Sequence, residues 1–261
     1  MGRAIYVSSV NGDDANSGYA PEKAFRSLRK VNQMEIQPGD QILLERGSVF
    51  IGEYLHLYAG GTKEAPVVVD AYGEGSLPRI ETDGNGIWYQ NYGGHLDNVV
   101  HTWKGYLSSA VLLYDTEYIS IRNLEITNNP CVKNERLNQA DRMNRTGVSV
   151  IAKNHGTLHE IELDHLYIHD VEGNIYDKHL NNGGIYMSVS RPDDEEKTGI
   201  ARYDGIHIHH CKVENCRRWG IAAGYTYQHD KFTTLELPDE VVKAYGSTNV
   251  VIEHNFVKDI G

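Results

Sequence analysis

The chain has 261 residues, of which 40% are hydrophobic and 23% are charged. This composition is typical of a folded globular protein and excludes a disordered chain. The formal net charge of −11 argues against nucleic acid or an anionic membrane as a partner, because phosphate groups require a basic face.

No segment of the sequence is long and apolar enough to cross a bilayer. No secretory signal precedes the first predicted strand, which begins at Ile5. We therefore expect a cytoplasmic protein, or an extracellular one if Met1 and Gly2 are not native residues.

The first predicted elements form an N-terminal cap. A strand over residues 5–8 leads into a loop where Asp13, Asp14 and Asn16 offer oxygen ligands. Their spacing is not that of an EF-hand, so a weak calcium site stands as the alternative to an Asx-turn. A proline followed by one apolar stripe predicts a short amphipathic helix over residues 21–31, which we expect to close the N-terminal end of the fold.

Short strands and an aromatic stretch follow this cap. The strands are predicted within residues 38–47, 55–57, 66–70 and 78–80. The aromatic residues are Trp88, Tyr89, Tyr92, Trp103 and Tyr106. They are compatible with a platform for stacking sugar rings and equally with an ordinary packed loop.

One eight-residue pattern then occurs four times, at residues 119–126, 161–168, 206–213 and 250–257. Apolar residues alternate at its start, a polar pair interrupts them, and alternation resumes one residue out of step. This pattern predicts two short strands joined by a sharp bend. A third strand, entered through glycine, is predicted at residues 147–152, 184–189 and 219–224.

The pattern recurs every 42 to 45 residues, which predicts an all-β protein folded as a right-handed parallel β-helix with a short N-terminal capping helix. Residues 1–109 would form the cap and the first irregular coils, and residues 110–261 the regular coils. The chain stops where another glycine strand is due, so we expect an open last coil that further coils or a partner would cover. Loops of uneven length beside the glycine strands predict a ligand groove there.

Several segments resemble the carbohydrate-active β-helix proteins, most closely glycoside hydrolases of the family 141 type. The segments are residues 6–18, 24–28, 38–47, 65–75, 146–150, 166–171 and 249–255. The resemblance implies a glycosidase acting on a plant cell-wall polysaccharide, such as xylan or a pectin-type glycan. Its motifs are specific for the fold and much less so for the reaction, because β-helices carry many activities. We expect no resident cofactor.

Counting nine residues from each copy of the pattern gives Asn128, Asp170, Asn215 and Asp259. Asp170 and Asp259 would lie two strands apart, or ~9.6 Å at the usual strand spacing. Inverting glycosidases hold their two carboxyl groups about 6.5–9.5 Å apart, so the pair is a candidate acid and base. The alternative is an Asn/Asp ladder that satisfies the backbone of the bend. Asp204 is a further catalytic candidate.

Candidate substrate contacts surround the same predicted groove. Guanidinium groups can bind sugar hydroxyls, and aromatic rings can pack on sugar faces. The candidates are Tyr186, Arg217, Arg218, Trp219, Tyr225 and Asp177.

The histidines and cysteines predict structural roles. His165, His210 and His254 recur at one position of the pattern, and a straight ladder does not converge as zinc ligands must. We therefore expect a structural stack and no metal. Three cysteines do not form a disulfide framework, and Cys211 is expected to be a buried free thiol.

Two other functions remain open at this point. A polysaccharide lyase needs positive charge beside a uronate carboxylate, which the acidic composition disfavours. A glycan-binding or structural solenoid needs no catalytic carboxylates. The predicted partner is an oligo- or polysaccharide.

Overall fold

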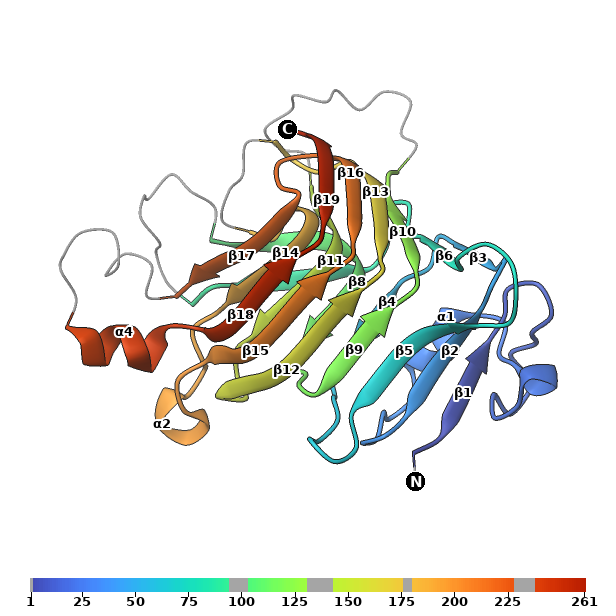
Figure 1. Cartoon of the computed structure of the whole chain (residues 1–261), viewed down its shortest axis with the longest axis horizontal. Helices are drawn as coiled ribbons and strands as arrows, with labels where there is room; N and C mark the ends of the chain where they lie inside the picture. Colours follow the sequence, from blue (N-terminus) through green and yellow to red (C-terminus); the bar gives the residue numbers. More distant parts are fainter. Residues whose placement is uncertain (1, 94–102, 131–142, 176–179, 228–237) are drawn as a thin grey trace.

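The structure is a computed structural model that describes residues 2–93, 103–130, 143–175, 180–227 and 238–261 (Figure 1). Three sheets, built mainly of parallel strands, surround one hydrophobic core. The chain visits the three sheets in turn, so each strand pairs with a strand about one pattern length away. The core cluster extends from Ile5 to Tyr227.

The first sheet is seven-stranded and parallel along its whole width. Its strands in order are β1 (Ala4–Val7), β2 (Gln41–Glu45), β5 (Val67–Tyr72), β9 (Ile119–Arg122), β12 (Thr157–Asp164), β15 (Arg202–His209) and β18 (Thr248–Glu253). Ile161 pairs with Ile119 on one side and with Ile206 on the other, so equivalent residues of the pattern are neighbours. Ile161 and Leu163 point into the core, and Glu162 points outward, as strand alternation requires.

The second sheet has six parallel strands and forms the next side of the molecule. They are β3 (Val49–Ile51), β6 (Arg79–Glu81), β10 (Glu125–Asn128), β13 (Tyr167–Val171), β16 (Lys212–Cys216) and β19 (Phe256–Ile260). Ile80, Ile126, Ile168 and Val213 lie side by side across it and are fully buried.

The third sheet contains the strands that the sequence predicts to enter through glycine. Its strands are β4 (Leu55–Leu57), β8 (Lys104–Tyr114), β11 (Asn144–Ala152), β14 (Gly183–Val189) and β17 (Ile221–Thr226), with β7 (Ile87–Asn91) antiparallel to β8. Glycine is needed at residue 147 because a Cβ there would lie 2.5 Å from the Ile168 side chain.

Both faces of this third sheet are buried along β11, β14 and most of β8. The outward side chains form a polar network in which Trp88 donates from Nε1 to Ser109 Oγ at 2.8 Å. The Gln90 amide nitrogen donates to Asn181 Oδ1 at 3.0 Å and to Ser188 Oγ at 3.1 Å. The face that we predicted to be the floor of an open groove is therefore covered by β7, and that prediction is wrong for this part of the chain.

Left-handed residues make the bends between sheets. Asn123, His165, His210 and His254 occupy one bend with φ between 50° and 58°. Asp170, Asn215 and Asp259 occupy a second with φ between 48° and 53°. Asparagine, aspartate and histidine are the residue types that most readily adopt this conformation without being glycine.

The structure corrects the predicted fold class. A uniform right-handed β-helix closed by a helix over residues 21–31 is not what the chain forms. It is an all-β arrangement of three mainly parallel sheets, with β7 antiparallel and with short helices in the connections. The helices are a 3₁₀ turn η1 (Pro21–Lys23), α1 (Leu28–Asn32), α2 (Glu195–Thr198) and α4 (Asp239–Tyr245).

The predicted capping helix fails at Phe25. The Phe25 N–H donates to the Tyr6 carbonyl at 2.9 Å, and the Phe25 carbonyl accepts from the Ser8 N–H at 2.8 Å. These bonds hold Phe25 beside β1 in extended form, so a helix cannot pass through it. The helix α1 is therefore only five residues long. The Glu53 carboxylate accepts a hydrogen bond from its first N–H group, that of Leu28, at 2.6 Å.

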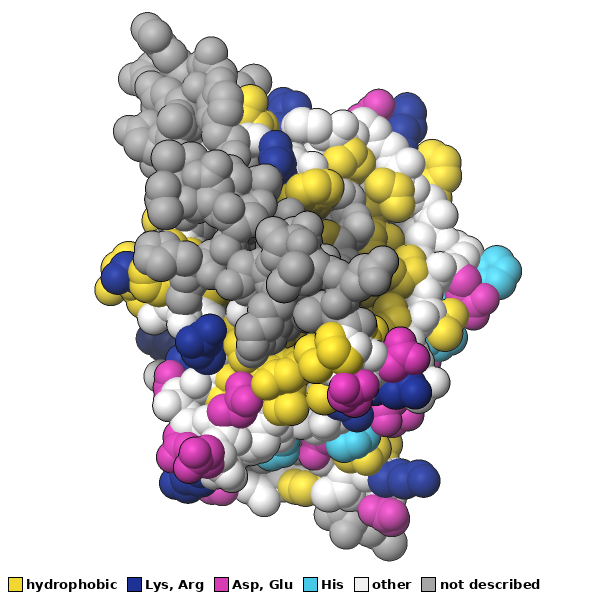
Figure 2. Space-filling model, turned by 90° about the vertical axis from the view of Figure 1, so that its left-hand side faces the viewer, with side chains coloured by type: hydrophobic (Ala, Val, Ile, Leu, Met, Phe, Trp, Pro, Cys, Tyr) yellow, Lys and Arg dark blue, Asp and Glu magenta, His cyan; other side chains and the backbone are white. Residues whose placement is uncertain are grey.

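Several apolar side chains of β18 and β19 are exposed. They are Val250, Val251, Ile252, Phe256 and Val257. Figure 2 shows hydrophobic side chains grouped on the face at this side of the molecule. No helix in the described residues is long and apolar enough to span a membrane.

The cysteine prediction is confirmed for Cys211, which is a buried free thiol with 2% of its surface exposed. Cys216 is buried and free in the same way. Burial raises the pKa of Cys211 to about 11 and that of Cys216 to about 12. Cys131 lies outside the described residues.

Candidate active site at the Asp170 corner

Asp170 lies at the bend where β13 leaves the second sheet, and its side chain is 45% exposed. The Asn215 amide on the neighbouring strand donates to Asp170 Oδ1. His169 Nδ1 lies 2.7 Å from Asp170 Oδ2, and its Nε2 lies 3.1 Å from Glu125 Oε1. Asp170 is therefore accessible to a ligand and is held in position from two sides.

A surface hollow of ≈ 360 Å³ opens beside this carboxylate. Its lining comes from β6, β10, β13 and the residues that follow β6 and β10. The lining residues are Arg79, Glu81, Asp83, Thr127, Asn129, His169 and Asp170. We call this hollow with its lining the Asp170 corner.

Asp83 is a second carboxylate in the Asp170 corner. Burial raises its pKa, and the negative charge of Glu81 raises it further. Arg79 partly balances this charge, because its guanidinium lies 2.9 Å from Glu81 Oε2 and 3.4 Å from Glu125 Oε1. A carboxyl group with a raised pKa beside an accessible carboxylate is an arrangement that can supply an acid and a base.

The backbone fixes where these two carboxylates lie. Glu81, Thr127 and His169 occupy one register across β6, β10 and β13. The outer members of this row, Glu81 on β6 and His169 on β13, are separated by two strand spacings or ~9.6 Å. Asp83 follows Glu81 in the chain, and Asp170 follows His169. Asp83 is left-handed, with φ of 54°, and the next N–H, that of Gly84, donates to Asn128 Oδ1 at 2.9 Å.

The structure does not place Asp259 in the Asp170 corner. Asp259 is on β19, two strands beyond Asp170 in the same left-handed column, with 65% of its side chain exposed. Lys258 Nζ lies 3.3 Å from its carboxylate. Asn128 is not in this column at all, because a register shift after Thr127 pairs Asn128 with Val171 and buries it.

Asp204 lies in a different sheet from Asp170. It is on β15, where its Oδ1 accepts from Thr248 Oγ1 at 2.8 Å and from Asn249 Nδ2 at 2.7 Å. These two hydrogen bonds lower the pKa of Asp204. The three predicted catalytic carboxylates thus do not form one constellation.

Two predicted substrate contacts, Arg217 and Arg218, are engaged with neighbouring protein groups. Arg217 Nε lies 3.3 Å from Glu172 Oε2. Arg218 Nη1 donates to the Ile175 carbonyl at 2.9 Å, and its guanidinium lies 5.1 Å from the centre of the Trp219 ring. The three neighbours 217–219 are partly exposed and follow β16, so they flank the bend that Asp170 also occupies on β13.

The remaining predicted contacts differ in placement. Tyr186 is on β14 with 1% of its surface exposed, so it belongs to the covered face of the third sheet. Tyr225 lies on β17, but its side chain is not among those that the structure describes, and Asp177 lies outside the described residues. Among the aromatic residues between positions 88 and 106, Trp88 and Tyr92 are buried, whereas Tyr89 and Tyr106 are exposed and pack edge to face at 5.0 Å.

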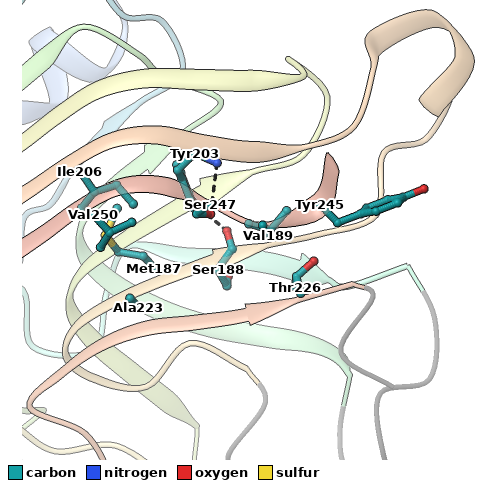
Figure 3. Close-up of a pocket in the computed structure, with 11 residues that line it drawn as sticks. Met187, Ser188, Val189, Tyr203, Ile206, Ala223, Thr226, Tyr245, Ser247 and Val250 are labelled. Atoms are coloured by element: carbon teal, nitrogen blue, oxygen red, sulfur yellow. Dashed lines mark hydrogen bonds between the residues drawn. The ribbon is translucent and has the colours of Figure 1, made fainter. Parts of the chain in front are cut away.

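A second hollow, of ≈ 200 Å³, has a different character (Figure 3). Met187, Ile206 and Val250 gather at one end of it. Tyr203 donates from its hydroxyl to the Ser188 carbonyl at 2.8 Å. No carboxylate is among the lining residues described, so this hollow offers no group for acid and base chemistry.

The weak calcium prediction concerned Asp13, Asp14 and Asn16. Asp13 Oδ1 accepts from the Ala15 N–H at 2.9 Å, which is an Asx-turn. Asp14 accepts from the N–H and the hydroxyl of Ser27, at 2.9 and 2.7 Å. These oxygens organise the N-terminal loop.

Sequence reasoning missed Asp83 and His169. Asp83 follows a strand from the irregular N-terminal region, where no copy of the eight-residue pattern gives its register. His169 was passed over because it precedes the position that we counted. An acidic residue beside Glu81 in a turn ending with glycine was the signal available for Asp83.

No protein-family model matches the chain. A lacto-N-biosidase of Bifidobacterium longum subsp. longum is 38% identical over 296 residues, which cover 100% of this chain and 18% of that protein. Crystal structures of a GH136 lacto-N-biosidase from Eubacterium ramulus, a selenomethionine derivative and the native protein, have TM-scores of 0.97 and 0.95 to this chain. They are 54% and 55% identical to it and cover 100% and 98% of it.

The chain spans less than half the length of these relatives, because 42% and 41% of the solved chains are covered. The relatives are lacto-N-biosidases, which corrects two expectations from the sequence. The solved relatives are of family GH136 and not of the family 141 type, and none of these relatives is named for xylan or pectin. Over its whole length, the chain is similar to GH136 lacto-N-biosidases.

Proposed function

We propose that this protein is a glycoside hydrolase that releases lacto-N-biose from a neutral oligosaccharide, such as a milk oligosaccharide ending in that disaccharide. The similarity to lacto-N-biosidases over the whole chain supports the reaction. The observation that carries the site is that Asp83 and Asp170 line the same hollow.

The charges around the Asp170 corner favour a neutral substrate. Glu81, Asp83, Glu125 and Asp170 outnumber Arg79 as charged groups in and beside the hollow. A uronate carboxylate entering this site would be repelled, because like charges at short range disfavour binding. Lacto-N-biose carries hydroxyl groups and an acetamide but no charge, so it avoids this penalty. The same argument disfavours a polysaccharide lyase.

Asp83 is the proposed general acid. Its raised pKa keeps it protonated to higher pH, so it can protonate the oxygen of the glycosidic bond as that bond breaks. Asp170 is the proposed second catalytic carboxylate, and it would face the anomeric carbon of the sugar. Asn215 and His169 orient it. Asparagine at either position keeps the side-chain shape and removes the proton transfer or the charge.

The test measures release of lacto-N-biose from a chromogenic lacto-N-bioside by wild type, Asp83→Asn and Asp170→Asn. General acid–base catalysis contributes typically 10²–10⁴-fold, so each variant is expected to lose about that factor in kcat/KM. Asp259→Asn is the matched control, because Asp259 shares the left-handed column but lies outside the hollow. It should keep wild-type activity.

Two failures would be distinguishable. If the wild-type protein releases no lacto-N-biose, the proposed reaction is wrong. If it does and both asparagine variants keep full activity, the reaction stands and the Asp170 corner is not the active site. A product with an unsaturated, ultraviolet-absorbing end would indicate a lyase.

A further inference from the structure

Two adjacent strands of the first sheet end in pairs of metal-binding residue types. β12 ends in Asp164, which His165 follows, and β15 ends in His209, which His210 follows. Asp164 and His209 are direct partners in the parallel pairing. The four side chains therefore come together from positions about 45 residues apart in sequence.

Their ligand atoms converge. Asp164 Oδ1 lies 2.5 Å from His165 Nδ1, 3.0 Å from His209 Nδ1 and 3.8 Å from His210 Nδ1. His209 Nδ1 and His210 Nδ1 lie 2.8 Å apart. In a tetrahedral zinc site with bonds of about 2.0–2.1 Å, neighbouring ligand atoms are about 3.3 Å apart. These four separations scatter around that value, and one ligand atom from each of Asp164, His165 and His210 lies within 4.8 Å of the other two.

The bend explains why a ladder can converge. In a strand, consecutive side chains point to opposite faces. His165 and His210 are left-handed, with φ of 50° and 52°, so each ring turns back toward the residue before it. The stack of rings also fixes their planes, because His165 lies 4.9 Å from His210 with 10° between the rings.

A further carboxylate orients His209 as a ligand. His209 Nε2 lies 3.3 Å from Glu162 Oε1, and Glu162 Oε2 accepts from Ser120 Oγ at 2.6 Å. When Nε2 carries the hydrogen, Nδ1 presents its lone pair to Asp164 and His210. Metal-bound histidines commonly donate their other nitrogen to a carboxylate in this way.

We propose that Asp164, His165, His209 and His210 bind one Zn²⁺ at the edge of the first sheet. Three imidazole nitrogens and one carboxylate oxygen are a donor set that suits this ion, and four protein ligands make a structural site. The ion ties β12 to β15 at the outside of the bend. This site lies on the first sheet, away from the Asp170 corner, and does not depend on the proposed activity.

A second trio nearby is the competing arrangement. Glu162, His207 and His209 have ligand atoms within 4.8 Å of one another. His207 Nε2 lies 3.0 Å from Glu253 Oε1, and His209 would have to use Nε2 instead of Nδ1. This trio offers one ligand fewer, so we assign the ion to the four-residue set.

The test titrates Zn²⁺ into metal-free, tag-free protein by calorimetry and follows the melting temperature with and without Zn²⁺. Wild type should bind one ion and melt at a higher temperature with it. His165→Ala and His210→Ala should each weaken binding by at least tenfold. Glu162→Gln should weaken it by about 10–100-fold, as loss of an orienting carboxylate does.

Two histidine variants are the matched controls. His254→Ala removes a ring that stacks on His210 at 5.2 Å but is not in the set, and His207→Ala removes the ligand unique to the competing trio. Both should bind Zn²⁺ as wild type does. The proposal is overturned if wild type binds no Zn²⁺, if His207→Ala abolishes binding while His165→Ala does not, or if His254→Ala weakens binding as much as His210→Ala.

Discussion

The two bends that flank the second sheet use the same backbone device and carry different chemistry. Each is a column of left-handed residues that are not glycine, His165 and His210 at the first bend and Asp170 and Asn215 at the second. At the first bend the column presents imidazoles to Asp164. At the second it presents a carboxylate to a hollow.

The comparison shows that a left-handed histidine or aspartate can pair with its predecessor, whereas Asn123 and Asn215 donate to Asp70 and Asp170 on a neighbouring strand. His165 contacts Asp164 at 2.5 Å, and Asp170 contacts His169 at 2.7 Å. A regular strand would send these side chains to opposite faces. A bend of this kind therefore turns two consecutive residues into one two-pronged group, and parallel stacking places several such groups beside each other.

The largest expected effect tests whether the left-handed backbone conformation destabilises a valine equally at both bends. Asn123 and Asn215 have φ of 58° and 48°, and valine is strained in this conformation. Asn123→Val and Asn215→Val should each lower the free energy of unfolding by about 1–3 kcal/mol more than the matched glycine variants. Denaturation by urea measures this. Equal stability of the valine and glycine variants at either bend would contradict a shared device.

The next effect concerns the buried residue after each left-handed position, Cys211 at the first bend and Cys216 at the second. An unfolded thiol loses its proton near pH 8.5–9, whereas burial raises the folded pKa values to about 11 and about 12. Each thiol therefore contributes stability that is complete below pH 8.5–9 and is lost as the pH rises toward the folded pKa. The slope should approach about 1.4 kcal/mol per pH unit for each thiol.

The measurement compares wild type with Cys211→Ala and Cys216→Ala by denaturation between pH 8 and 11. Each variant should be less stable at pH 8, because a buried side chain is truncated, but its stability should fall less steeply above pH 9. A wild-type slope that both variants reproduce would show that the thiols are not responsible.

A smaller effect tests whether the charge of Glu81 controls the pKa of Asp83 near the second bend. Glu81 raises the pKa of Asp83, so Glu81→Gln should lower it. If Asp83 is the general acid, the alkaline limb of kcat/KM should move to lower pH. Glu253→Gln, beside the histidine column, should leave this limb in place. A limb that does not move in Glu81→Gln would remove Asp83 from the role of acid.

The smallest effect uses a left-handed residue in the first sheet. Asn249, with φ of 52°, donates to Asp204 and helps to lower the pKa of that exposed carboxyl group. In Asn249→Gly the backbone conformation is kept and the amide is lost. The pKa of Asp204, measured by NMR titration, should rise toward its ordinary value. An unchanged pKa would mean that Thr248 alone accounts for the shift.

Much of the strand order could be predicted from the sequence, because alternation of buried residues such as Ile161 and Leu163 fixes which face is inside. The antiparallel strand β7 could not, since its partners in the polar network come from distant segments. The helix over 21–31 was predicted from an apolar stripe, but backbone pairing of Phe25 with β1 overrides that local preference.

The site was predicted only in part. Asp170 was found by counting along the pattern, whereas the shift after Thr127 moves Asn128 out of the same column. The convergence of His165 with Asp164 was missed because strand alternation assumes that neighbouring side chains diverge. A single left-handed residue reverses that rule, and the sequence marks it only weakly, by a polar residue between apolar ones.

The amide of Gln90 also bears on how the protein is made. Its partners Asn181 and Ser188 lie 91 and 98 residues further along the chain. At a synthesis rate of about 5–20 residues per second, roughly 5–20 seconds pass before the ribosome delivers them. Neighbouring strands of the sheets become available to each other in about half that time. β7 can pair with β8 early, but the Gln90 amide would stay hydrated until β14 has been synthesised.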